Sequence, residues 1–258
     1  TNVDKALLEE TLEIYRNDGH VCKRCEDTGY IGSTKCECFQ KLLREAAFDA
    51  LGASHPQDCR FSNFSLDYYS PQPLANGVVP RQRMAQVKNF CSDYARDFFV
   101  ERHSFSKAQS SPSLLFLGNT GLGKTHLSLA IAGQVINKGY GVIYGSAQNL
   151  LAKLEKEKFS FNNTEDQPQS YLSLVLECDL LILDDLGTEF LSQFVTAMLY
   201  NIINTRLLEG RPTIISTNLS FQEISKRYTD RLTSRLFGGY MHFEFLGRDI
   251  RIQSKIMG

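Results

Sequence analysis

Residues 114–125 have the sequence Leu-Leu-Phe-Leu-Gly-Asn-Thr-Gly-Leu-Gly-Lys-Thr. The first four are apolar and predict a short buried strand, Leu114–Leu117, and a helical pattern, His126–Lys138, follows directly after the last. The eight residues in between, Gly118–Thr125, fit the pattern G-x-x-x-x-G-K-[ST]. A phosphate-binding loop requires a strand directly before this pattern and a helix directly after it. We therefore expect an α/β protein built around a nucleotide site.

The chemistry of phosphate binding explains the residue types in this loop. Glycines let the backbone curl until its N–H groups point at phosphate oxygens, beside a helix N-terminus that favours anions. Lys124 is expected to reach the β- and γ-phosphates of ATP, and the Thr125 hydroxyl to bind Mg²⁺. A glycine-rich turn with an unrelated lysine is the alternative, which the full spacing disfavours. The predicted nucleotide-binding residues are Gly118, Asn119, Thr120, Gly121, Leu122, Gly123, Lys124, Thr125 and His126.

A second apolar run, Leu180–Leu183, ends in Asp184 and Asp185. In a parallel sheet, side chains that follow a strand lie at the carboxyl edge, where such folds bind ligands. We expect Asp184 to hold the Mg²⁺, and Asp185 to orient or deprotonate the attacking water. Two acids after a strand are a weak signal alone, because turns often contain Asp. The phosphate-binding loop upstream makes the functional interpretation strong.

Two further polar features follow along the chain. The run Thr213–Thr217 predicts a strand before Asn218, whose amide either terminates the strand or positions water beside the γ-phosphate. Arg231 and Arg235 are four residues apart in a helical pattern and share one face. Arginines on a helix are usually solvated, so only the order of the motifs favours a functional role.

Helical and apolar patterns alternate from residue 81 onward, which predicts a parallel sheet covered by helices on both faces. The other expected helices are Arg81–Arg102, Gln148–Lys158, Leu191–Glu209 and two short ones before the last strand. The other expected strands are Val142–Tyr144 and His242–Phe245, and Phe159–Ser170 is an expected loop. Residues 1–19 and Phe39–Leu51 also have helical patterns. We divide the chain into an N-terminal helix and cysteine module (1–52), a lead-in (53–80) and an ATPase domain (81–258).

Composition and charge limit the possible partners. The 258 residues are 42% hydrophobic and 22% charged, and no run approaches the ~18–20 apolar residues that span a bilayer. The formal net charge of −1 argues against binding nucleic acid by overall charge, so any DNA contact has to come from local patches. No secretory leader opens the chain, and a cytoplasmic protein is the simplest interpretation. Because the chain starts at Thr1 rather than Met, we treat it as a possible fragment.

Four of the seven cysteines lie within seventeen residues: Cys22, Cys25, Cys36 and Cys38. Two close thiolate pairs joined by a short turn match tetrahedral Cys₄ zinc ligation, with His20 as a possible substitute ligand. Because all four ligands come from the protein, the zinc is expected to be structural. A redox pair is the alternative, but it leaves the second pair unexplained. The other three are expected to be small core residues: Cys59, Cys91 and Cys178.

The motifs occur in the order and approximate spacing of AAA+ ATPases. More narrowly, the chain resembles the bacterial helicase loaders of the DnaC/DnaI type, to which the IstB transposition helpers are related. The narrower resemblance, over roughly residues 60–252, rests on three segments: Arg60-Phe61-Ser62-Asn63-Phe64, Leu183-Asp184-Asp185-Leu186-Gly187 and Gly247-Arg248-Asp249-Ile250-Arg251. It implies an AAA+ core with little or no helical lid.

The resemblance also implies roles for single residues. Asn218 corresponds to sensor 1, and Arg251 lies where sensor 2 is expected. Arg235 corresponds to the arginine finger that reaches into a neighbouring subunit's ATP. The implied catalytic residues are Lys124, Asp185, Asn218 and Arg235, and Asp184 and Arg251 join the nucleotide-binding set.

The implied function is a DNA replication factor that loads the replicative helicase onto single-stranded DNA. It would bind and hydrolyse ATP in a homo-oligomer formed in the ATP state. The cysteine module favours a loader over an IstB protein. Two alternatives stay open: an IstB-like transposition helper, and an ATP-binding switch with little hydrolysis.

The helix Gln148–Lys158 lies where this family has its single-strand-binding insertion. Cations and aromatic rings suit a single strand, since they bind its backbone and stack on its bases. The residues of that kind are Lys153, Lys156, Lys158, Phe159 and Phe161. Glu155 and Glu157 are interleaved with them, so an ordinary solvated helix face stays an alternative.

Overall fold

The computed structural model describes residues 22–32, 34–39, 42, 59–100, 110–159 and 170–257. The chain divides into two compact units, Thr1–Ala46 and Ala47–Gly258, and each is described by itself. The predicted helix of residues 1–19 lies outside the described residues, as do most of the predicted helix Phe39–Leu51 and of the predicted loop Phe159–Ser170. Within the described ranges, none of the helices has the length and apolarity needed to cross a membrane.

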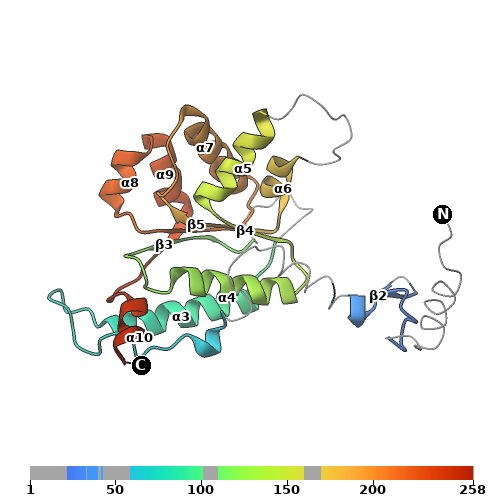
Figure 1. The fold of residues 1–258 in the computed structure, drawn as a ribbon, viewed down its shortest axis with the longest axis horizontal. Helices are drawn as coiled ribbons and strands as arrows, with labels where there is room; N and C mark the ends of the chain where they lie inside the picture. The colour runs from blue at the N-terminus through green and yellow to red at the C-terminus, as the bar shows by residue number, and fades with distance from the viewer. Residues whose placement is uncertain are drawn as a thin grey trace, which may run out of the picture. The chain divides into compact units, whose positions relative to one another are not determined.

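A five-stranded sheet forms the centre of the larger unit (Figure 1). Its strands are β3 (Ser113–Leu117), β4 (Val142–Ser146), β5 (Leu180–Leu186), β6 (Thr213–Thr217) and β7 (Tyr240–Glu244). They lie in the order β4-β5-β6-β3-β7, and every neighbouring pair is parallel. The predicted parallel sheet is confirmed, although its last strand begins at Tyr240 rather than at His242.

Helices cover both faces of this sheet (Figure 1). One face carries α3 (Pro80–Asp97) and α4 (Lys124–Asn137). The other carries α5 (Ala147–Phe159), α6 (Tyr171–Glu177), α7 (Gln193–Leu208), α8 (Phe221–Arg227) and α9 (Asp230–Gly239). In the part of the chain that the structure describes, α10 (Ile250–Met257) is the one helix after β7. This is the helix-covered parallel α/β sheet that the sequence predicted.

Local side-chain chemistry explains where the helices differ from expectation. Helix α3 ends at Asp97, before residue 102, because Phe98 turns into extended backbone and is buried. Helix α6 was not predicted; it is too short to show a helical period, but the Ser170 side chain caps it by accepting from the Ser173 N–H at 3.1 Å. Ser192 caps α7 in the same way.

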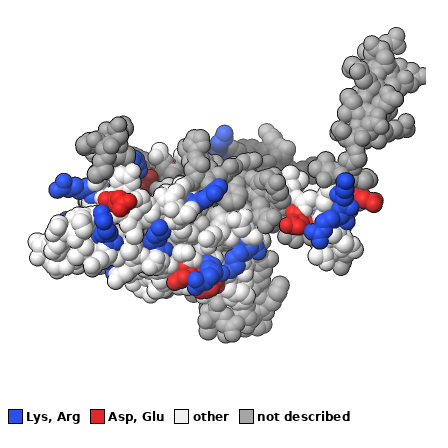
Figure 2. Space-filling view, turned by 90° about the horizontal axis from the view of Figure 1, so that it is seen from below, with Lys and Arg blue, Asp and Glu red and all other residues white. Residues whose placement is uncertain are grey.

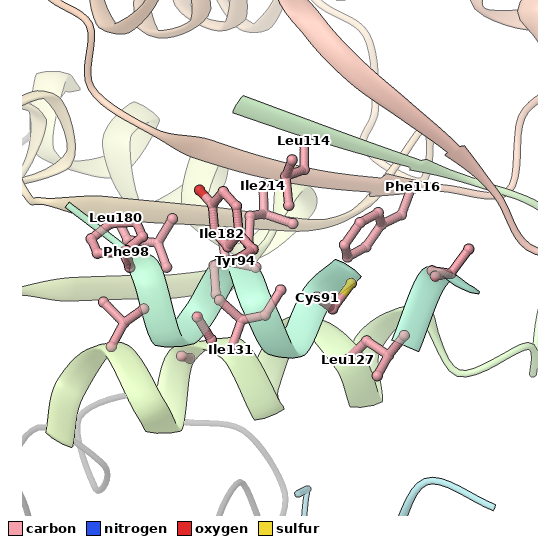
Figure 3. Packing of buried hydrophobic residues seen from close by; sticks show 14 of the residues in the cluster. Cys91, Tyr94, Phe98, Leu114, Phe116, Leu127, Ile131, Leu180, Ile182 and Ile214 are labelled. Carbon is pink, nitrogen blue, oxygen red and sulfur yellow. The ribbon is translucent and has the colours of Figure 1, made fainter. Parts of the chain in front are cut away.

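The core between the sheet and the α3–α4 layer contains aromatic and aliphatic side chains (Figure 3). The residues labelled there are Cys91, Tyr94, Phe98, Leu114, Phe116, Leu127, Ile131, Leu180, Ile182 and Ile214. A second cluster on the opposite face takes the alternate strand residues Leu115, Leu181, Leu183 and Ile215. Each fully buried side chain of this size contributes ~1.5–3 kcal/mol. The strands are continuous apolar runs because both of their faces are covered.

The lone cysteines have three different environments. Cys91 is fully buried in the core, as predicted. Cys178 lies at the edge of the second cluster, where the fully buried Arg206 guanidinium donates to its Sγ at 3.4 Å. Cys59 is only partly buried and lines the pocket described below, so its prediction as a core residue is wrong.

The described residues of the smaller unit, 22–32, 34–39 and 42, bury little apolar surface. They include a hairpin in which β1 (Tyr30–Ile31) pairs antiparallel with β2 (Thr34–Lys35). Among the unit's described residues the buried ones are Cys25, Gly29 and Cys36, whereas Tyr30 and Ile31 are exposed. A unit of this size needs a stabilising element other than apolar burial.

Candidate nucleotide and metal sites

The loop between β3 and α4 has the backbone of a phosphate cradle. Gly118, Gly121 and Gly123 have φ values of 143°, 74° and 84°, in the region that favours glycine. A Cβ on Gly118 would lie 2.5 Å from the Phe245 carbonyl oxygen, so no larger residue fits there. Helix α4 begins at Lys124 directly after this loop, which places its N–H groups beside the cradle.

The ammonium group of Lys124 joins the loop to β6. It donates to the carbonyl oxygens of Gly118 at 2.6 Å and Asn119 at 2.8 Å, and to Asn218 Oδ1 at 2.6 Å. Burial lowers the pKa of Lys124 to about 8, although the nearby Asp185 and Asp184 carboxylates act in the opposite direction. The structure thus brings the predicted lysine and the predicted Asn218 amide together.

Asp184 is 3% exposed and accepts hydrogen bonds on both carboxylate oxygens. Oδ2 accepts from the Thr125 hydroxyl at 2.8 Å and from the Tyr144 hydroxyl at 2.8 Å. Oδ1 accepts from the Ser216 hydroxyl. Burial and the neighbouring Asp184 raise the pKa of Tyr144 far above its usual range. A carboxylate beside a threonine hydroxyl is a pair of oxygen donors of the kind that Mg²⁺ prefers, so these residues fit the ion.

Asp185 has a φ of 54°, which is uncommon for a residue with a side chain. Its N–H donates to Ser216 Oγ at 3.0 Å, and the pairing of β5 with β6 shifts register between Leu183 and Leu186. This local break in the strand places Asp185 in the pocket lining beside Lys124. Burial, followed by the Asp184 charge, raises the pKa of Asp185, which Lys124 and Arg251 oppose. Strained backbone of this kind is concentrated at functional sites.

A pocket of about 350 Å³ opens over the loop. Its lining contains residues 120–126 together with Asp185, Asn218, Ile250 and Arg251. The lining also contains lead-in residues that were not predicted as site residues: Cys59, Asn63, Phe64, Ser65 and Tyr68. The loop is tied to this lead-in, since His126 Nε2 lies 2.9 Å from the Arg60 carbonyl oxygen and its ring contacts Phe64. In the sequence the segment Arg60–Phe64 carries only the family resemblance and gives no signal of a pocket contact.

The segment before α10 packs against the loop. The Ile250 N–H donates to the Gly121 carbonyl oxygen at 2.9 Å. A Cβ on Gly121 would lie 2.0 Å from the Asp249 carboxylate. Arg251 follows and lies in the pocket lining. Arg235, in contrast, lies on the exposed face of α9 and is not part of this pocket lining.

The four clustered cysteines meet in the smaller unit. Their Sγ atoms all lie within 4.8 Å of one another, with Cys22 and Cys36 at 3.7 Å and Cys25 and Cys38 at 3.3 Å. Sulfurs on a tetrahedron of 2.3 Å Zn–S bonds are about 3.8 Å apart, so the cluster fits zinc. Hydrogen bonds from the backbone of Arg24 and Cys25 lower the pKa of Cys22 to about 6, whereas the hydrogen bond with Cys25 raises the pKa of Cys38 well above its usual range. A bound cation would stabilise the thiolate form of both.

The lysines of α5 lie over aromatic rings. Lys153 Nζ is 3.8 Å from the ring centroid of Tyr171, and Lys158 Nζ is 4.9 Å from that of Phe194. Lys156 is exposed. On the face shown in Figure 2, the described basic and acidic side chains are interspersed.

Comparison with known families now adds to this geometry. The family model of the IstB-like ATP binding protein matches residues 89–243, which contain the loop, both aspartates, Asn218 and Arg235. The chain belongs to this IstB-like family. Two curated relatives differ in the function that their names state. The replicative helicase loader DnaC of Escherichia coli strain K12 is 27% identical over 124 residues, 48% of this chain and 49% of DnaC. A putative ATP-binding protein of insertion sequence IS5376 from Geobacillus stearothermophilus is 28% identical over 148 residues, 55% of this chain and 57% of that protein.

A solved structure of the DnaC helicase loader shares the fold of this IstB-like chain. It superposes with a TM-score of 0.52 at 23% identity, covering 71% of this chain and 97% of that one. The predicted resemblance to the DnaC type and to IstB is confirmed. The chain spans about half the length of the curated relatives that it matches.

Proposed function

We propose that the chain is a magnesium-dependent ATPase whose active site is the pocket over residues 118–125. The observation that carries the proposal is the hydrogen bonding that gathers Lys124, Thr125, Asp184 and Asn218 around one loop, with Asp185 in the same pocket. ATP with Mg²⁺ would supply the phosphoryl group and the charge neutralisation for its transfer. We propose further that the cysteine cluster holds one structural zinc.

Each residue has a chemical task in this proposal. Lys124 exchanges its carbonyl partners for phosphate oxygens, and Asp184 and Thr125 hold the ion. Asp185 accepts the proton of the attacking water, and Asn218 orients that water. Arg251 binds the phosphates from the α10 side. The family resemblance assigns Arg235 to the ATP of a neighbouring subunit, and its position outside the pocket of its own subunit is compatible with that role.

We propose that the energy of ATP is used to load a replicative helicase onto single-stranded DNA. The match to DnaC, which is a helicase loader by name, supports this function. The fit of the cysteine cluster to zinc supports a module beside the ATPase domain, with the boundaries 1–52, 53–80 and 81–258. The proposed contacts to the single strand are the lysines of α5, Lys153, Lys156 and Lys158, of which the first and last lie over the rings of Tyr171 and Phe194.

The second candidate is a transposition helper that acts with a transposase on duplex DNA. It is favoured by the IstB-like family model and by the IS5376 relative, whose match covers more of the chain than the DnaC match does. A pull-down with the replicative helicase of the source organism separates the two. The loader proposal expects ATP-dependent capture of the helicase and ATP turnover that responds to single-stranded DNA. Turnover that responds only to duplex DNA, with no capture of the helicase, would favour the helper.

A further inference from the structure

The hydroxyl of Tyr144 contacts the proposed magnesium ligand, although no motif accounts for it. It donates to Asp184 Oδ2 at 2.8 Å, the oxygen that also accepts from Thr125 at 2.8 Å. Ser216 donates to the other oxygen. The carboxylate is thus held from three elements at once: β4, the start of α4 and β6.

We propose that Tyr144 is a positioning residue that fixes the Asp184 carboxylate for the metal. This inference rests on the proposed function and names a residue that acts through Asp184. A carboxylate that accepts on both oxygens loses hydrogen bonds when it rotates, so its direction is set before the ion arrives. Partners of this kind orient metal ligands, and their removal typically weakens metal affinity or activity about 10–100-fold.

The strand pairing explains how a residue outside the motifs reaches this site. In the parallel pair β4–β5, Tyr144 lies opposite Ile182 and Ser146 lies opposite Asp184. Tyr144 therefore lies two residues before the position opposite Asp184. Because side chains two residues apart point to the same face of a strand, Tyr144 lies on the face that α4 covers. The ring of Tyr144 packs against the core cluster of that face, and this packing fixes the position of the hydroxyl relative to Asp184.

A purely structural tyrosine would use the same ring contacts. In that case the hydroxyl donates to Asp184 only because it needs a hydrogen-bond acceptor, and removing the hydroxyl leaves the metal site unchanged. Tyr144→Phe distinguishes the two because it keeps the ring and removes the oxygen. Tyr140→Phe is the matched control, since its ring packs against Phe98 at a centroid distance of 5.1 Å and Tyr140 does not line the pocket.

The test titrates Mg²⁺ against full-length protein with a fluorescent, non-hydrolysable ATP analogue, and records the electron paramagnetic resonance spectrum of Mn²⁺ in the same complex. For Tyr144→Phe we expect the half-saturating Mg²⁺ concentration to rise about tenfold, together with a changed Mn²⁺ spectrum. Analogue affinity without metal and the melting temperature should match those of Tyr140→Phe.

Two results would overturn the inference. A half-saturating concentration and a Mn²⁺ spectrum equal to those of the parent mean that the hydroxyl does not position Asp184. A loss of analogue affinity that is equal with and without metal means that Tyr144 supports the whole pocket rather than the ion. If the parent protein itself shows no metal-dependent analogue binding, the proposed function fails as well.

Discussion

The nucleotide-binding unit and the cysteine unit are stabilised in different ways. The larger unit has two clusters of buried apolar side chains, one on each face of its sheet. The described part of the smaller unit buries little besides Cys25, Gly29 and Cys36, while four sulfurs meet within 4.8 Å. In the larger unit, packing of the apolar clusters fixes the strands and helices, and these elements position the site residues. In the smaller unit the proposed ligands are themselves the core.

Metal removal should therefore give the largest effect, and it should be confined to the smaller unit. Structural zinc contributes about 10–16 kcal/mol in small zinc domains, which is their whole folding free energy. Chelation is expected to remove hydrogen-exchange protection from residues 22–39 and to expose all four thiols to a thiol reagent. Protection of β3 should be unchanged. Purified protein without zinc, or protection of residues 22–39 that survives chelation, would contradict the claim that metal binding stabilises the smaller unit.

The next effect concerns Arg235, which is proposed to act on the ATP of a second copy. An arginine finger contributes about 10³–10⁵ in rate, so Arg235→Ala should bind ATP normally and hydrolyse it far more slowly. Specific activity of the parent should rise with protein concentration. Mixing Arg235→Ala with Lys124→Ala should restore activity, because one subunit then supplies the loop and the other supplies the finger. If specific activity is independent of protein concentration and mixing gives no rescue, Arg235 interacts only with the surface of its own subunit.

Packing sets the third effect, which should spare the smaller unit. Ile182 is fully buried in the cluster beneath α3 and α4. Ile182→Ala is expected to lower the free energy of unfolding by about 2–5 kcal/mol through lost burial and the cavity left behind. Leu208→Ala, at a 50% exposed position, should cost less than about 0.5 kcal/mol. Chemical denaturation measures both, and zinc content should stay at the parental level in each. Loss of zinc from Ile182→Ala would show that the two units are not independent.

The smallest effect is a pH dependence that only the larger unit should show. Burial lowers the pKa of Lys124 from 10.5 to about 8, and Asp185, Asp184 and Arg251 are the charges that face it. Phosphates bind the protonated amine, so ATP affinity should fall above pH 8, by up to about tenfold per pH unit. The unfolded chain holds this proton more tightly, so stability without nucleotide should rise between pH 8 and 10.5. Calorimetric titrations of ATP at pH 7.5, 8.5 and 9.5 test this, with Lys124→Arg as the control, because a guanidinium stays protonated over this range and should show no such trend.

Features of the larger unit could be predicted when their residues are close together in the sequence, and could not when tertiary contacts bring the residues together. The loop at residues 118–125 is contiguous, and the strand that precedes Asp184 is a continuous apolar run. Both therefore carry a signal in a short window. Tyr144 and Ser216 carry none, because they meet Asp184 only through the pairing of β4 and β6 with β5.

The lead-in and the buried Arg206 were missed for similar reasons. Phe64 and Tyr68 lie in an irregular stretch without a period, and they reach the pocket by tertiary packing. Within the described ranges Arg206 has no carboxylate partner and instead donates to backbone carbonyl oxygens at the end of α6, including those of Val175 and Leu176. A charged residue in a helical pattern is usually solvated, so its burial could not be expected.

ATP turnover by Asp185→Asn tests the central claim, that this pocket hydrolyses ATP, most directly. Asn tolerates the positive φ of this position as Asp does, so the fold should be kept while the proton acceptor is lost. Single-turnover hydrolysis of ATP with Mg²⁺ should be at least about 10²-fold slower than for the parent, at unchanged ATP affinity. Hydrolysis at the parental rate, or a parent that binds ATP and does not hydrolyse it at any concentration, would contradict the account.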